Sequence, residues 1–151
     1  MSLMYMGWCM AGWDVCIIDG GWLCARKRKN LDYYSCVLCQ TALEETLPHL
    51  FFTCPFSLQC WQLLGIAWDF TLSTSEMIIR ASQLFGSTIF REISILECSC
   101  IWTHRNSIIF YGRSLSLVRW RQSFKDEFAL ILHRAKPSLK QELETWFCNT
   151  F

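Results

Sequence analysis

Apolar residues in the second half of the chain recur at helical spacing. In residues 88–110, Ile89, Ile93, Leu96 and Cys100 lie four, three and four positions apart, so one side of an α-helix would carry all four. Two later stripes have the same spacing and predict two further helices that pack against a core. These stripes consist of Leu117, Trp120, Phe124, Phe128 and Ile131, and of Leu139, Leu143 and Trp146.

Capping residues, glycines and prolines indicate where the helices begin and end. Small hydroxyl side chains favour the N-cap, glycine favours the position after the last turn, and proline suits the first turn. The expected helices cover residues 75–85, capped by Ser75 or Thr74 and ended by Gly86; residues 88–110; a stretch begun by Ser114 or Ser116; and a stretch begun by Pro137.

Shorter elements are expected before residue 75. Residues 33–40 are typical of a short strand and turn, and residues 46–53 predict a short helix with Thr46 as its N-cap. Residues 55–64 predict a helix ended by Gly65, which can take a left-handed conformation. Its apolar residues Cys60, Trp61 and Leu64 share one side.

Residues 66–74 predict a loop, in which the alternation of Trp68, Phe70 and Leu72 also allows a short strand. The fold class expected from all these patterns is mainly α. A small module of mixed α and β structure, made of a short strand and turn with short helices, precedes a helical region.

The first 25 residues show neither the helical nor the strand period, and no element is predicted there. Asp14 and Asp19 interrupt the apolar stretch, and no basic residue precedes Arg26. A signal peptide and a membrane span both need an unbroken apolar run. We therefore expect an intracellular protein, in the nucleus or the cytoplasm, that is not secreted and does not enter a membrane.

Ten cysteines among 151 residues are many for a reduced intracellular chain. Three of them form a spaced set with a histidine: Cys36 and Cys39, then His49 after nine residues, then Cys54 after four more. Thiolates and imidazole are the ligands that zinc prefers, and a Cys-x-x-Cys turn can direct two sulfurs at one ion. The spacing predicts one zinc ion bound by all four residues, which makes the site structural because no position stays open for water.

The alternative is that these four residues are buried without a metal, since free cysteine packs well in protein interiors. The other seven cysteines form no second set, and we expect them in the core. His104 is isolated and is expected on a helix surface. The seven are Cys9, Cys16, Cys24, Cys60, Cys98, Cys100 and Cys148.

The net charge of +1 is the balance of segments with opposite charge. Residues 36–100 carry two basic and six acidic residues, whereas residues 101–136 carry seven basic and two acidic ones. A positive block suits contact with phosphates, although a solvated helix face explains it equally well. The basic candidates are Arg26, Lys27, Arg28 and Lys29, and Arg113, Arg119, Arg121 and Lys125 as a second face. Tyr33, Tyr34 and Trp61 could stack on bases, or could pack around the metal turn and in the core.

Residues 26–70 resemble the zinc-binding region that follows the reverse transcriptase in plant LINE-type (non-LTR) retrotransposons. The resemblance is carried by the basic lead-in at 26–29, by the metal set, and by the run Glu-Thr-x-x-His-Leu-Phe-x-x-Cys-Pro-Phe-Ser from Glu45 to Ser57, followed by Trp61. It extends more loosely to residue 147 through the stretch IWTHRNSIIF at 101–110. Residues 1–20 do not share it, and we expect them to be disordered or derived from a shifted reading frame.

The resemblance divides the chain into an unassigned segment 1–21, a zinc-binding module 22–70 and a helical region 71–151. It implies a truncated retrotransposon polyprotein whose module assists binding of RNA or single-stranded DNA and whose reverse transcriptase domain was an intramolecular partner. The chain has no Asp-Asp pair, no Gly-rich phosphate loop and no G-x-S-x-G sequence, so we expect neither an enzyme nor a small-molecule substrate. The alternative function is a protein-interaction element that docked on the polymerase, with zinc purely structural.

Overall fold

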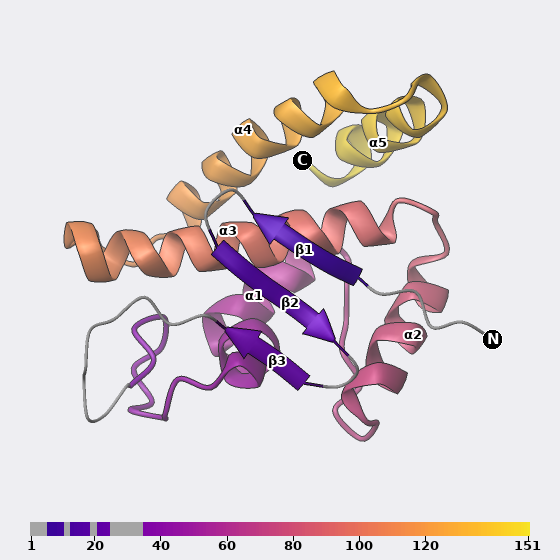
Figure 1. The fold of residues 1–151 in the computed structure, drawn as a ribbon. Helices are drawn as coiled ribbons and strands as arrows, with labels where there is room; N and C mark the ends of the chain where they lie inside the picture. The colour runs from indigo at the N-terminus through magenta and orange to yellow at the C-terminus, as the bar shows by residue number, and fades with distance from the viewer. Residues whose placement is uncertain (1–5, 11–12, 19–20, 25–34) are drawn as a thin grey trace.

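The computed structural model describes residues 35–151 and, by their backbone, three strands nearer the start of the chain. These strands are β1 (Met6–Met10), β2 (Trp13–Ile18) and β3 (Gly21–Cys24), which form an antiparallel sheet in the order β1-β2-β3. Its register pairs Trp8 with Val15 and Cys16 with Leu23. All three strands lie in the first 25 residues, for which the hydrophobic pattern predicts no element (Figure 1).

Residues 35–65 combine a looped segment with two short helices. Ser35 and Glu44 form an isolated antiparallel bridge that closes the loop. The short helix expected near 46–53 is present as a π-helix, η1 (His49–Thr53), and α1 (Pro55–Leu63) follows it. Gly65 has a φ of +74° after the last turn of α1, which confirms its predicted role as the residue that ends this helix.

Four longer helices make up the rest of the molecule, and the fold is mainly helical as expected. They are α2 (Thr74–Phe85), α3 (Phe90–Tyr111), α4 (Leu117–Arg134) and α5 (Pro137–Thr150). Helix α3 is central: α1, α2, α4 and η1 all contact it, and α5 packs on α4 (Figure 1). No helix of the described residues is both long and apolar enough to cross a membrane.

Helix starts agree with the sequence expectation at α4 and α5 but not at α2, and α3 begins at Phe90, two residues after its expected start. Ser116 caps α4, where its Oγ accepts the Arg119 N–H at 3.2 Å, and Pro137 begins α5. The N-cap of α2 is Ser73 rather than Ser75 or Thr74, because Glu76 reaches back to the Ser73 N–H at 3.1 Å and completes a capping box. Residues 66–73 form no strand, so the alternation of Trp68, Phe70 and Leu72 was misleading.

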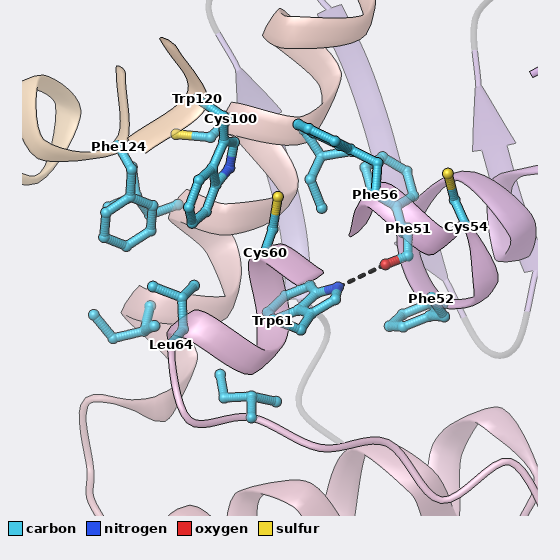
Figure 2. Close-up of a cluster of buried hydrophobic side chains, with 14 of the residues drawn as sticks. Phe51, Phe52, Cys54, Phe56, Cys60, Trp61, Leu64, Cys100, Trp120 and Phe124 are labelled. Atoms are coloured by element: carbon cyan, nitrogen blue, oxygen red, sulfur yellow. Dashed lines mark hydrogen bonds between the residues drawn. The ribbon is translucent and has the colours of Figure 1, made fainter. Parts of the chain in front are cut away.

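One hydrophobic core includes side chains from residues 36–66 and from the helices α2–α5. Figure 2 shows a part of it. The apolar stripes predicted for the helices face it: Ile89, Ile93, Leu96, Cys100, Trp120, Phe124, Phe128 and Leu143 are buried. Trp61 on α1 is also buried and donates its Nε1–H to the Phe51 carbonyl at 2.6 Å. Because a buried indole N–H needs an acceptor, this bond anchors α1 to the π-helix beside it.

Candidate metal centre

The first two candidate ligands sit in a loop closed by backbone hydrogen bonding. Next to the Ser35–Glu44 bridge, the Cys36 N–H donates to the Leu43 carbonyl at 2.9 Å. Cys36 is buried and Cys39 is partly buried, while Leu38 between them is only 1% exposed. The buried Leu38 fixes the loop on the core, and the two cysteines flank the turn at residues 37–38.

The other two ligands lie at the two ends of η1. The N-cap of η1 is Pro48 rather than the expected Thr46. Thr46 lies two residues earlier, and its Oγ1 accepts the His49 N–H at 3.2 Å. The Cys54 N–H then donates to the His49 carbonyl at 2.7 Å. A π-helical hydrogen bond joins residues five apart, and the spacing of four residues between His49 and Cys54 matches that bond.

Pro55 explains why the π-helix stops at the fourth ligand. A residue before proline is driven out of the helical region by a steric clash with the proline ring. Cys54 accordingly has an extended backbone, with φ −64° and ψ 130°, and Pro55 begins α1. The break turns the chain at Cys54, whose side chain is completely buried.

The four side chains converge on one point. The ligand atoms of Cys36, Cys39, His49 and Cys54 all lie within 4.8 Å of one another. The Cys36 and Cys54 sulfurs are 3.8 Å apart, and the Cys39 sulfur is 3.3 Å from His49 Nε2. A tetrahedral zinc ion separates two sulfur ligands by about 3.8 Å and a sulfur from a nitrogen by about 3.5 Å. A disulfide would instead bring two sulfurs to about 2.05 Å.

Protonation of the two buried thiols is coupled. The hydrogen bond with Cys36 lowers the pKa of Cys54, against the opposing effect of burial. The same bond, together with burial, raises the pKa of Cys36. One thiol therefore holds a proton that its partner shares. A metal ion requires both as thiolates, so binding would release this proton.

Two threonine hydroxyl groups are within hydrogen-bond distance of candidate ligands. His49 Nδ1 is 3.2 Å from Thr53 Oγ1, which leaves Nε2 directed at the cluster. Thr41 Oγ1 is 2.9 Å from the Cys39 sulfur and can donate to its thiolate. Such outer partners hold a ligating imidazole in one tautomer and stabilise sulfur charge.

The cluster can hold a metal ion with four protein ligands. All four are thiol or imidazole, and no carboxylate belongs to the group, a set that suits zinc better than calcium or magnesium. Every vertex of a tetrahedron would be filled by a side chain. Such a centre stabilises structure rather than activating a water molecule.

An ion pair that the sequence analysis missed ties this segment to α3. Arg105 donates from Nε to Glu45 Oε1 at 2.9 Å, and its Nη2 contacts the same oxygen. The two side chains are only 12% and 8% exposed. Arg105 also lies over the Trp102 ring at 5.1 Å. Glu45 lies four residues before His49, so the ion pair holds the segment that precedes η1 against the central helix α3.

His104 is buried, which contradicts the expectation of a helix surface. Its ring stacks on Phe56 at 5.1 Å between centroids, and its Nε2 accepts the Ser116 N–H at 3.3 Å. Burial, and then the nearby Arg119, lower the pKa of His104 to about 4. The neutral imidazole therefore joins α1 and α3 to the start of α4.

The remaining candidates are distributed as follows. Arg26, Lys27, Arg28 and Lys29, with Tyr33 and Tyr34, lie outside the described residues, as do the side chains of Cys9, Cys16 and Cys24. Trp61 is a core residue that no base could reach. Cys60 and Cys100 are buried as expected and Cys98 is partly buried, but Cys148 is exposed, contrary to its expected place in the core.

No family model matches the chain, and no curated protein and no solved structure is significantly similar to it. Its function has to be inferred from its own residues and their geometry.

Proposed function

We propose that this protein is a non-catalytic zinc-binding module of retrotransposon origin that assists binding of RNA or single-stranded DNA. One structural zinc ion is held by Cys36, Cys39, His49 and Cys54. The observation that carries the proposal is the convergence of these four ligand atoms within 4.8 Å, with a sulfur–sulfur separation of 3.8 Å.

Zinc has a structural task in this segment. Residues 35–48 contain one isolated bridge and little helix, and so short a loop has little surface to bury. A metal that joins Cys36 and Cys39 to His49 and Cys54 fastens the loop to the helical body, and its binding energy becomes folding energy. The zinc would then hold a shape on which other residues act.

Charge supports a nucleic-acid ligand. Residues 98–125 include five basic residues and no acidic one. Of these five, only Arg105 has an ion-pair partner among the residues that the structure describes. The basic run 26–29 adds four further positive charges to the chain. Unpaired cations bind phosphate by releasing its counterions, which gives the interaction a steep salt dependence.

The test is a salt titration of binding. Zinc-loaded protein is mixed with a fluorescein-labelled single-stranded 20-mer of RNA or DNA, and the Kd is measured by anisotropy between 50 and 200 mM NaCl. Four to eight phosphate contacts would weaken binding by roughly 30- to 3,000-fold over this range. Replacing residues 26–29 by glutamine should lower the slope. Absence of binding at 50 mM NaCl, or binding indifferent to salt, contradicts the nucleic-acid role.

A protein-interaction role is the second candidate, and exposed apolar side chains favour it. On α2, Ile79 and Leu84 are 53% and 67% exposed, and on α4 Val118 and Leu130 are 80% and 51% exposed. Large exposed apolar side chains mark a contact with another protein where they form a contiguous patch. In this role zinc is purely structural and the helices dock on a larger domain. Binding of a protein that persists at high salt, without binding of nucleic acid, would support it.

A further inference from the structure

The junction between α3 and α4 exposes aromatic and basic side chains together. It comprises the last turn of α3, residues 112–116 and the first turns of α4, at one end of the central helix (Figure 1). We call this surface the α3–α4 corner. Its exposed side chains are Phe110, Tyr111, Arg113, Leu115, Val118 and Arg121. Tyr111 is 78% and Phe110 54% exposed, although aromatic rings of this size normally pack in a core.

Every charged residue in the chain segment that forms the corner is basic. No Asp or Glu occurs between Glu97 and Asp126. Neither Arg113 nor Arg121 forms an ion pair with any described residue. Arg121 lies over the Phe151 ring at 5.1 Å, a contact that orients the guanidinium and leaves its edge donors available. The surface therefore suits an anionic partner.

The backbone of the corner is held in place before any ligand binds. Gly112 ends α3 with a φ of +61°, and the buried His104 accepts the Ser116 N–H. Arg119 turns inward and donates from Nη2 to the Ser114 carbonyl. These two hydrogen bonds and the left-handed glycine fix the loop between the helices. A preformed surface loses little conformational entropy when it binds.

We propose that the α3–α4 corner is the surface that binds single-stranded nucleic acid, with bases stacked on Tyr111 and Phe110 and phosphates held by Arg113 and Arg121. Aromatic faces can stack only on bases that are free of a duplex, and neighbouring cations follow the backbone. The absence of carboxylates disfavours a basic protein partner. This inference rests on the proposed nucleic-acid role and locates it on the helices rather than on the metal loop.

The test compares matched variants of the full zinc-loaded chain. Tyr111→Ala should weaken binding of a labelled dT 12-mer by about 5- to 150-fold, whereas Tyr111→Phe should retain most of the affinity because the ring remains. Arg113→Gln should reduce the slope of log K against log salt by about 1. Leu84→Ala is the control, since Leu84 is a large apolar residue that is 67% exposed on α2. Zinc content and circular dichroism of each variant verify its fold.

The outcomes separate the two proposals. If the wild type binds with steep salt dependence and Tyr111→Ala binds with the same affinity, the assignment of binding to the α3–α4 corner is wrong. The nucleic-acid role then still stands. A wild type that binds neither RNA nor single-stranded DNA overturns both. Duplex DNA bound as tightly as the dT 12-mer contradicts stacking on the exposed rings. A protein contact or self-association that Tyr111→Ala abolishes, with nucleic-acid affinity unchanged, assigns the corner to a protein partner instead.

Discussion

The metal loop and the helices α2–α5 obtain their structure in different ways. Residues 35–48 have one backbone bridge and place Cys36 and Cys39 beside His49 and Cys54. The helices have apolar stripes that pack in a core, where for example the ring centroids of Phe124 and Phe128 are 6.2 Å apart. In the proposed account, the first region depends on bonds to a metal ion, whereas the second depends on buried apolar area. Although the two regions share one core, perturbing one should therefore affect the other less.

The largest effect is expected from Cys54→Ser. Removing one ligand should abolish tight zinc binding, and the lost free energy of folding should be on the order of 5 kcal/mol or more, because structural zinc contributes about 10–16 kcal/mol in small Cys/His modules. Hydrogen exchange should show faster exchange in residues 33–64, before α4 and α5 are affected. Cys148→Ser, at an exposed position, serves as the control. Uniform loss of protection across the chain would show that the two regions are not separable.

Phe124→Ala is the reciprocal perturbation. Phe124 is fully buried and its ring contacts those of Trp120, Phe128, Trp146 and Phe151. The cavity should cost about 3–5 kcal/mol of stability, measured by urea denaturation. Zinc content should stay that of the wild type. Loss of the metal along with the helices would instead mean that the core positions the ligands.

The Glu45–Arg105 pair tests how tightly the regions are joined. Arg105→Gln leaves a largely buried carboxylate without its partner and should cost about 2–3 kcal/mol. In a double-mutant cycle, Glu45→Gln should recover part of this loss, since it removes the charge that was left unpaired. Strictly additive losses would show that the pair contributes no coupling.

The smallest expected effect concerns the pH dependence contributed by His104. Its pKa is lowered to about 4 in the folded protein, below the ordinary 6.5. Between these values the unfolded chain binds more protons, so the free energy of unfolding should fall as pH decreases from about 6.5 to 4. We expect a contribution of about 2 kcal/mol.

His104→Gln should remove this part of the profile, because an amide oxygen can accept the Ser116 N–H without titrating. The exposed His133→Gln on α4 is the matched control. Comparison of the two variants cancels the proton dependence of the metal ligands. Identical profiles for both variants would show that His104 does not titrate with folding.

The features that could be predicted from the sequence depend on residues that are near one another in the chain. Helical stripes such as Trp120, Phe124 and Phe128 follow from spacing along one helix, and all three are buried. The metal ligands were predicted from a spacing that a turn and a single π-helical bond can satisfy. Both inferences need only near neighbours in the chain.

Contacts between distant segments were not predictable in this way. Arg105 and Glu45 are 60 residues apart, and nothing in either segment indicates the other. His104 was expected on a surface because its neighbours in the sequence are polar. Nothing in them indicates the distant Phe56 ring on which it stacks. Glu97 lies fully buried beside the Leu96 stripe, where burial raises the pKa of its carboxyl. No local pattern distinguishes such a residue from a solvated one.

The coordination of the metal is the most direct test of the account. Purified wild-type protein should contain one zinc ion per chain, and X-ray absorption at the zinc edge should show three sulfur ligands near 2.3 Å and one nitrogen ligand near 2.0 Å. Cys54→Ser, prepared in parallel, should lack the ion. A wild type that folds fully without metal, or a zinc shell with fewer than three sulfurs, would contradict a Cys₃His centre formed by residues 36, 39, 49 and 54.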